Sequence, residues 1–176
     1  MATLISGSTG VNKITDGTIV NADIASGAAI AGSKLVMPTG SVLQVVTSED
    51  GGNSSSTSSS FTEIHSFSIS NVLSTSTVHI TAAISHLIED SGAGGFVVEK
   101  SDGSVIAKSQ HGTSGNGSWR MILPTLMGKD TSPSAGTNTY IVKMASSASG
   151  TTVYYNYWPT NHFNTRSFYQ TIEVAG

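Results

Sequence analysis

The sequence has no cysteine and little charge, and each shortage excludes a class of protein. Without cysteine the chain has neither a disulfide framework nor thiolate metal sites, so its stability must come from packing or assembly. Only 8 Lys and Arg residues stand against 11 Asp and Glu, and the basic residues are scattered singly. Because binding to a phosphate backbone needs clustered basic residues, nucleic acid is not an expected partner.

The sequence also lacks long apolar runs. No stretch approaches the roughly 18 apolar residues of a membrane-spanning helix. Residues 1–7 carry no basic flank ahead of an apolar segment, which a secretory signal requires. We therefore expect a protein that is made in soluble form in the cytoplasm and does not insert into membranes.

Hydroxyl-bearing residues and glycine take the place of the missing charge. The chain has 30 Ser, 21 Thr and 19 Gly among its 176 residues, and only 11% of residues are charged. Helices usually take their polar face from long charged side chains, whereas Thr suits strands and Ser and Gly suit turns. A hydrophobic content of 38% is still enough for a core. This composition predicts an all-β protein.

The first segment, residues 1–37, carries a short irregular repeat of apolar side chains that are five or six residues apart. That spacing fits neither a helix nor an ordinary strand, and turn-forming residues lie between the repeats. Because one such chain cannot bury these side chains alone, we predict an extended arm in which three chains wind about an axis. A weakly ordered tail and a short β-solenoid are the alternatives. The residues predicted to face the trimer axis are Ile14, Ile19, Ile24, Ile30 and Leu35.

The second segment, residues 38–176, shows short alternating runs divided by turn residues. Val78, Ile80 and Ala82 share one predicted strand face, and Ser101-Asp102-Gly103 predicts a hairpin. The Ser-rich stretch 51–60 is expected to be an exposed loop. We predict an antiparallel, jelly-roll-like β-sandwich. The candidate strands are Ser41 to Thr47, Phe61 to Ser70, Thr77 to Ile88, Gly95 to Lys100, Ser104 to Ser109, Ser118 to Leu123, Thr139 to Ala145, Thr151 to Trp158 and Ser167 to Val174.

Two parts of the sequence resemble tail-fibre and other virion structural proteins of tailed phages, especially marine and cyanobacterial phages. The repeat Lys13-Ile14-Thr15-Asp16-Gly17-Thr18-Ile19-Val20-Asn21-Ala22-Asp23-Ile24, continued at 28–35, is similar to a short repeat of such fibres. The segments Gly40-Ser41-Val42-Leu43-Gln44-Val45-Val46 and Gln170-Thr171-Ile172-Glu173-Val174-Ala175-Gly176 resemble the two ends of a fibre β-domain.

The resemblance implies a component of the virion that is assembled in the host cytoplasm as a homotrimer and contacts other virion proteins. Its repeat would form a shaft or attachment arm, and its β-domain would be distal. A capsid decoration protein or head fibre, anchored to the shell through the arm, is the alternative. The family supplies no catalytic residues and no cofactor.

No motif in the sequence indicates an enzyme or a metal site. The five histidines lack metal-ligand spacing such as H-E-x-x-H, and His79 and His86 are predicted to lie on opposite strand faces. The chain has no G-x-S-x-G nucleophile elbow. A glycan depolymerase would need paired carboxylates in a groove, and acidic residues are few. We therefore expect no catalytic residues, no metal and no cofactor.

Aromatic residues, although only 7% of the chain, gather between Tyr154 and Tyr169. Aromatic faces stack on sugar rings, and Asn, His and Arg donate directional hydrogen bonds, so an exposed version of this segment would suit a host surface glycan. The alternative is that the same aromatics pack in the core or between subunits. The candidate glycan contacts are Trp158, Asn161, His162 and Arg166.

Overall fold

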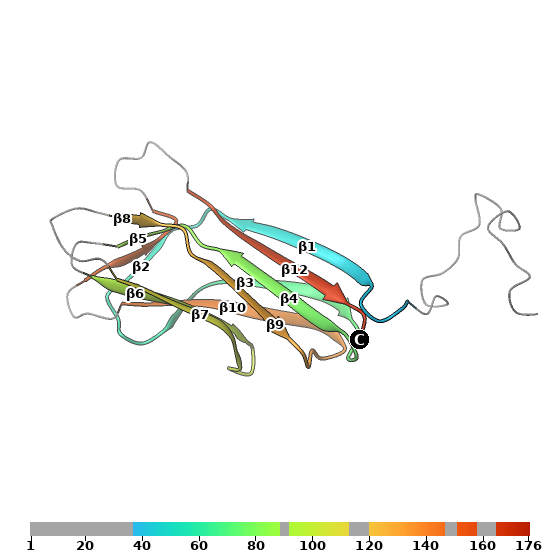
Figure 1. Cartoon of the computed structure of the whole chain (residues 1–176). Helices are drawn as coiled ribbons and strands as arrows, with labels where there is room; N and C mark the ends of the chain where they lie inside the picture. The colour runs from blue at the N-terminus through green and yellow to red at the C-terminus, as the bar shows by residue number, and fades with distance from the viewer. Residues whose placement is uncertain (1–36, 89–91, 113–119, 147–150, 158–164) are drawn as a thin grey trace, which may run out of the picture. The chain divides into compact units, whose positions relative to one another are not determined.

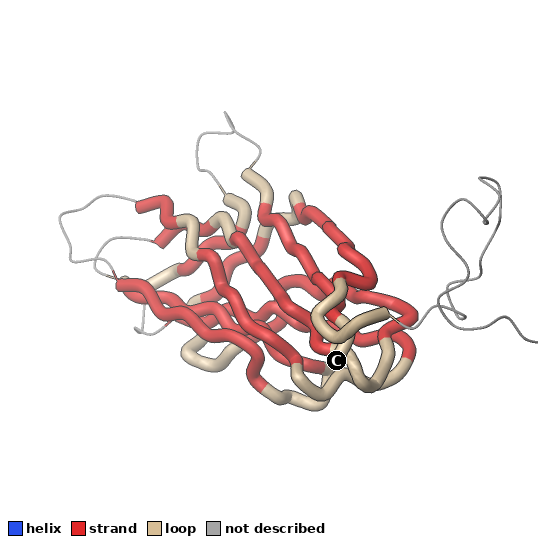
Figure 2. Tube along the Cα trace, turned by 45° about the vertical axis from the view of Figure 1, so that its right-hand side comes forward, coloured by secondary structure: helices blue, strands red, loops and turns tan. Residues whose placement is uncertain are grey.

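A computed structural model describes residues 37–88, 92–112, 120–146, 151–157 and 165–176. Every regular element in these ranges is a β-strand, and all strand pairs are antiparallel (Figures 1 and 2). The predicted all-β, antiparallel architecture is therefore confirmed for the described residues. The strands are β1 (Val42–Asp50), β2 (Ser54–Ser56), β3 (Thr62–Val72), β4 (Thr77–Ala83), β5 (His86–Ile88), β6 (Ala93–Lys100), β7 (Val105–Gly112), β8 (Arg120–Ile122), β9 (Thr125–Asp130), β10 (Gly136–Ser146), β11 (Val153–Tyr155) and β12 (Ser167–Val174).

The described strands form three four-stranded sheets with related orders. Two large sheets have the orders β1-β12-β4-β9 and β3-β10-β6-β7, and a small sheet has the order β2-β11-β5-β8. The strands at matching positions in the small sheet and the first large sheet follow one another in the chain: β1 and β2, β12 and β11, β4 and β5, and β9 and β8. The small sheet thus continues the first large sheet beyond a break in its four strands.

The two large sheets pack face to face and enclose the core. The rings of Phe67 from β3 and Tyr169 from β12 stack across the interface with centroids 4.9 Å apart. Alternate residues of each strand point inward, as a pleated strand requires. The core residues are Phe67, Ile69, Val72, Val78, Ile80, Ala82, Ile84, Ile88, Phe96, Val98, Leu126, Tyr140, Val142, Met144, Val153, Tyr155 and Tyr169.

The alternation expected from the sequence is present. Val78, Ile80 and Ala82 are all buried on one face of β4. The hairpin predicted at residues 101–103 joins β6 and β7, where Gly103 has a φ of +87°. Only glycine adopts this conformation without strain, and its N–H donates to the carbonyl of Lys100 at 2.9 Å.

The predicted single strand from Thr77 to Ile88 is divided in two. At the break, the N–H of Ile84 donates to the carbonyl of Pro124 at 2.9 Å. The next N–H, of Ser85, donates to Oγ of Ser167, also at 2.9 Å. Because a loop carbonyl and a side chain take these bonds, the regular ladder stops and the chain enters the small sheet.

The sequence indicated an exposed loop over the Ser-rich stretch 51–60, but part of this stretch is a strand. Ser54–Ser56 form β2, which pairs with β11, and Ser56 is 8% exposed. Serine is a poor strand former by propensity, so composition pointed to a loop. The ladder hydrogen bonds to β11 decide the conformation instead.

The sequence also gave no sign of β9. This strand begins after Pro124 and contains Gly128, two residues that are typical of turns. A Cβ on Gly128 would lie 2.5 Å from the carbonyl oxygen of Ile106 on β7. Glycine is required there because the edge strands of the two large sheets meet closely.

The two ends of the described domain lie side by side. β1 pairs with β12 from Val42 opposite Val174 to Asp50 opposite Ser167. The pairing extends outward, because the N–H of Gly40 donates to the carbonyl of Ala175 at 2.8 Å. The arm residues Ile14, Ile19, Ile24, Ile30 and Leu35 lie outside the described residues, so the predicted trimer axis stays a prediction.

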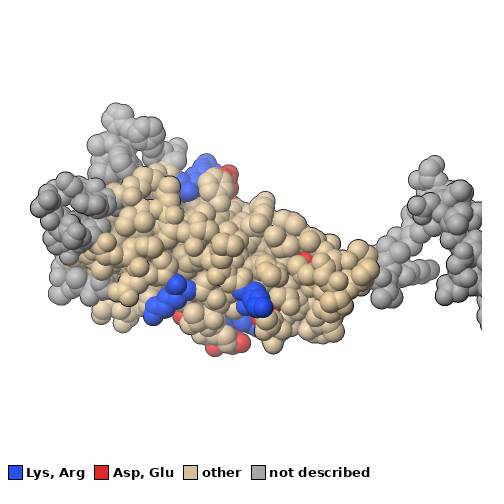
Figure 3. Space-filling view, in the orientation of Figure 1, with Lys and Arg blue, Asp and Glu red and all other residues tan. Residues whose placement is uncertain are grey.

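Charged side chains are sparse on the surface of the described domain. On the face shown in Figure 3, charged groups are few, and basic and acidic groups lie next to each other in places on an otherwise uncharged surface. No helix among the described residues has the length and apolar character needed to cross a membrane.

Candidate functional site

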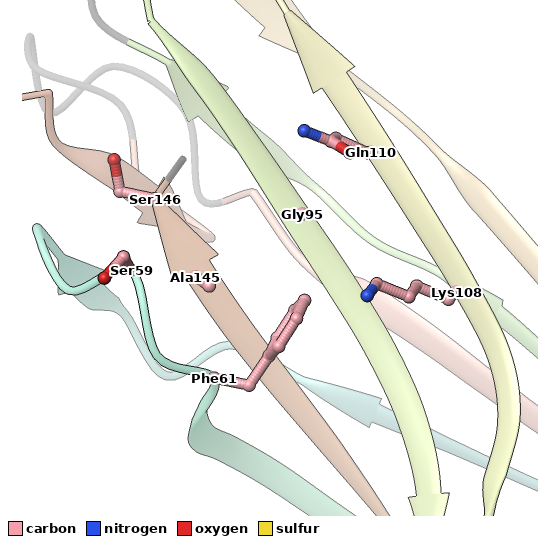
Figure 4. A pocket seen from close by; sticks show the side chains of 7 residues that line it. All are labelled: Ser59, Phe61, Gly95, Lys108, Gln110, Ala145 and Ser146. Atoms are coloured by element: carbon pink, nitrogen blue, oxygen red, sulfur yellow. The ribbon is translucent and has the colours of Figure 1, made fainter. Parts of the chain in front are cut away.

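A small pocket opens on the outer face of the sheet β3-β10-β6-β7 (Figure 4). Its floor is made of small residues, Gly95 on β6 and Ala145 on β10, which are both buried. The cavity has a volume of about 180 Å³. The lining residues are Ser59, Phe61, Gly95, Lys108, Gln110, Ala145 and Ser146.

Phe61 and Lys108 come from distant parts of the chain and meet at this pocket. Nζ of Lys108 lies 5.0 Å from the centroid of the Phe61 ring, which is the geometry of a cation–π contact. A Cβ on Gly95 would lie at ordinary van der Waals distance, 3.5 Å, from Cζ of Phe61, but it would crowd the carbonyl oxygen of Ser109 at 3.2 Å. Figure 4 shows the ring and the ammonium group on either side of the Gly95 strand.

The charges around the pocket leave Lys108 distinct from the other lysines of its sheet. Lys143 is paired with Glu99, and Lys100 is paired with Asp130 at 3.1 Å. Among the described residues, no carboxylate forms an ion pair with Lys108. The pocket therefore carries a cation that no carboxylate of the described domain balances.

A second hollow lies beside the small sheet, where two tyrosines stack. The rings of Tyr154 and Tyr157 have centroids 4.9 Å apart and planes 23° apart. Both side chains are half-buried, and the hollow has a volume of about 310 Å³. Its lining is aromatic and hydroxyl-rich without charge: Asn53, Ser54, Ser55, Tyr154 and Tyr157.

Asn156 shapes the turn that brings the two tyrosines together. It is one of two non-glycine residues in the described chain with positive φ, here +50°, a conformation that Asn tolerates better than most residues. Its Nδ2 donates to the carbonyls of Asp50 at 2.8 Å and Gly52 at 3.1 Å. Its Oδ1 accepts from the hydroxyl of Ser167 at 2.8 Å. These bonds hold the turn against the end of β1.

A partly buried polar cluster lies next to that turn. The Tyr155 hydroxyl donates to Oδ2 of Asp50 at 2.7 Å and lies 2.6 Å from the Tyr169 hydroxyl. Nδ1 of His65 lies 3.4 Å from the same carboxylate, and its ring stacks on Tyr169. Burial raises the pKa of Tyr155 far above its usual range and that of Tyr169 to about 12, so both hydroxyls stay protonated. The cluster joins side chains from four strands, β1, β3, β11 and β12.

Arg166 is the one candidate glycan contact that lies within the described residues. Its guanidinium donates to Oε1 of Glu49 at 2.8 Å, and both side chains are about half exposed. The predicted glycan contact of Arg166 stays a prediction. Trp158, Asn161 and His162 lie outside the described residues.

The histidines form no metal site in the described part of the chain. No group of three His, Asp or Glu side chains there has metal-binding geometry. His79 is exposed on β4 and His86 is buried in β5, so the predicted separation of these two side chains is confirmed.

His86 is instead a buried neutral side chain. It packs edge-on against Phe96 at 4.8 Å and lies 5.6 Å from His111. Burial, reinforced by His111 and opposed only weakly by the Ile122 backbone, lowers the pKa of His86 to about 3. Neither ring nitrogen makes a hydrogen bond of ordinary geometry. His86 therefore stays uncharged at neutral pH.

Sequence reasoning did not point to Phe61, Lys108 or Gln110. Lys108 and Gln110 lie 47 and 49 positions after Phe61 in the chain, and no short motif joins the three residues. Their meeting depends on the register of β6 with β7, which sets Gly95 opposite Gln110. The aromatic residues between Tyr154 and Tyr169 stood out in the sequence, and two of them, Tyr154 and Tyr157, line the tyrosine hollow.

Comparison with known proteins gives a distant likeness to viral particle proteins. The chain matches no protein-family model and no curated protein. It is similar to a structure of T=1 particles derived from infectious bursal virus, with 14% identity and a TM-score of 0.38 over 84% of this chain and 40% of that one. A second is the VP2 subviral particle of infectious bursal disease virus, with 12% identity and a TM-score of 0.35 over 85% and 42%. The chain thus spans about two fifths of the length of these structures.

Proposed function

We propose that this protein is a structural component of a virus particle, built on a jelly-roll domain. The observation that carries the proposal is the strand order. If β1 and β2, β4 and β5, β8 and β9, and β11 and β12 are each counted as one interrupted strand, the described domain has eight long strands in two layers. Their orders, 1-8-3-6 and 2-7-4-5, are those of a jelly roll, a fold that viral capsid and lectin domains use.

The N-terminal repeat directs the proposal toward a tailed phage. Because one fold serves many functions, the strand order alone does not choose among them. The repeat at residues 13–35 resembles that of phage fibres and needs neighbouring chains to bury its isoleucines. We propose a homotrimer in which the arms intertwine and the jelly-roll domains project. Three identical domains would bind a surface with avidity that one domain lacks.

Contact with a host cell surface is the proposed role of the projecting domain. The tyrosine hollow supports this role, because two stacked rings beside uncharged hydroxyl and amide groups suit a sugar. The second candidate is a capsid decoration or head-fibre protein, in which the arm is anchored in the shell. Both candidates are binding or structural roles that need no cofactor.

Two measurements test this proposal. Native mass spectrometry of the full chain should give three times the monomer mass, 18.1 kDa each. Removal of residues 1–36 should shift the mass to that of the monomer if the arms hold the trimer together. Peptide mass spectrometry of purified virions should detect the protein in a fixed copy number. A monomeric full chain would overturn the trimer, and absence from purified virions would overturn the structural role.

A further inference from the structure

The pocket of Figure 4 combines an apolar ring, one cation and neutral hydrogen-bonding groups. Phe61 offers a ring face that is partly exposed, and Nζ of Lys108 lies 5.0 Å from its centroid. The Gln110 side chain, opposite Gly95 in the ladder, adds an amide donor on the same side of the sheet. Ser59 adds a hydroxyl at the rim.

The charge balance of this face indicates an acidic ligand. Lys143 and Lys100, the other lysines of the sheet, are each neutralised by a carboxylate within the domain. Lys108 has no such partner among the described residues, and its ammonium group is exposed. A single cation does not suit a polyphosphate or a nucleic acid, which several cations must neutralise. One carboxylate matches one ammonium group in charge.

The shape of the pocket indicates a ligand of about one ring. The floor is made of Gly95 and Ala145, and the cavity of about 180 Å³ is smaller than the roughly 300 Å³ at which drug-sized sites begin. Sugar rings pack their C–H faces on aromatic side chains and offer hydroxyls for hydrogen bonds.

From these features we propose that the pocket binds a carboxylate-bearing sugar residue, such as a uronic acid of an acidic polysaccharide. The sugar ring packs against Phe61, and the carboxylate accepts hydrogen bonds from the Lys108 ammonium and the Gln110 amide. This inference deepens the proposed contact with a host surface and rests on it for its biological meaning. The binding test itself uses the isolated protein, so its failure leaves the test on virions unaffected.

The test is a titration of the full-length ¹⁵N-labelled protein with sodium glucuronate, glucose and sodium acetate, followed by NMR amide shifts. We expect saturable shifts at Gly95, Lys108 and Gln110 with glucuronate, with a dissociation constant on the order of 1 mM. Glucose lacks the carboxylate and acetate lacks the ring, so each should bind at least about tenfold more weakly.

Matched variants separate this pocket from general electrostatic attraction. Lys108→Gln and Phe61→Leu should each weaken glucuronate binding by about tenfold, which corresponds to about 1.4 kcal/mol. Lys129→Gln removes an exposed lysine from β9 of the other large sheet and should leave the affinity unchanged. Far-ultraviolet circular dichroism and the urea midpoint confirm that each variant is folded.

Four results would overturn the inference. Equal binding of glucose and glucuronate would mean that the cation plays no part. Equal binding of acetate and glucuronate would mean a simple anion site without a sugar contact. Equal effects of Lys108→Gln and Lys129→Gln, or no saturable shift at Gly95, would mean that the pocket is not the site.

Discussion

Replacement of the buried carboxylate of Glu173 by an amide should destabilise the domain more than any surface charge change. Glu173 is 2% exposed and has no cationic partner among the described residues. Its Oε1 accepts the N–H of Leu73 at 2.8 Å, and its Oε2 accepts Nε2 of Gln44 at 2.7 Å. It thereby fastens the turn between β3 and β4 to strands β12 and β1.

The Glu173→Gln variant keeps the shape but turns one acceptor into a donor. That donor must face either the Leu73 N–H or the Gln44 amide, which already donates to the carbonyl of Ser70 at 2.8 Å. Hydrogen bonds to charged groups contribute about 1.5–3 kcal/mol each, so we expect a loss of about 2–3 kcal/mol at pH 7. With a urea m-value of roughly 2 kcal/mol/M, the unfolding midpoint should fall by roughly 1 M.

The pH dependence of stability provides a second, independent test of the role of Glu173. Burial favours the neutral form of Glu173, but the hydrogen bonds from Leu73 and Gln44 outweigh it, so the folded pKa lies below the ordinary value of 4.5. The carboxylate therefore stabilises the fold above the unfolded-state pKa, and this stability is lost as the pH falls through the lower folded pKa. The difference between wild type and Glu173→Gln should shrink as the pH approaches 3.

The assay is urea unfolding of both proteins at pH 7 and pH 3, followed by tryptophan fluorescence and circular dichroism. Glu49→Gln is the control, because its half-exposed ion pair with Arg166 should contribute less than about 1 kcal/mol. The reasoning is refuted if Glu173→Gln costs no more than Glu49→Gln, or if its cost does not change with pH.

Three further changes test other parts of the fold. Between pH 6.5 and about 3, His86 is protonated in the unfolded chain but not in the folded one, so the free energy of unfolding should decrease as the pH is lowered. The His86→Leu variant should show a weaker pH dependence of stability in urea titrations. Tyr155→Phe leaves Asp50 without its hydroxyl donor and should cost about 1–2 kcal/mol, measured by urea unfolding. Gly128→Ala places a methyl group 2.5 Å from the Ile106 carbonyl oxygen and should lower stability by about 1–3 kcal/mol; an unchanged melting temperature would contradict the observed contact of β7 and β9.

The sequence predicted the parts of the fold that depend on local pattern. Alternation at Val78, Ile80 and Ala82 predicted a half-buried strand, because side chains on a strand alternate between faces. The hairpin at Asp102-Gly103 was predictable because glycine permits the positive φ that the turn requires. These features need no knowledge of distant residues.

The parts that were missed depend on contacts between distant segments. Ser54–Ser56 form a strand only because β11 supplies hydrogen bonds, and β9 tolerates Gly128 because another strand fills the space of its side chain. The pocket was missed for the same reason, since Phe61 and Lys108 meet only once the sheet is assembled. The pairing of Arg166 with Glu49 from β1 was missed in the same way, and the predicted glycan contact of Arg166 stays a prediction.

We propose that this chain is a jelly-roll structural component of a virus particle. The most direct measurement is a cryo-EM reconstruction of the native virion at a resolution that shows side chains. We expect density for the eight-stranded domain on the outside of the particle, in three copies about an axis formed by residues 1–37. A reconstruction in which every ordered protein is assigned and this chain is absent would contradict it.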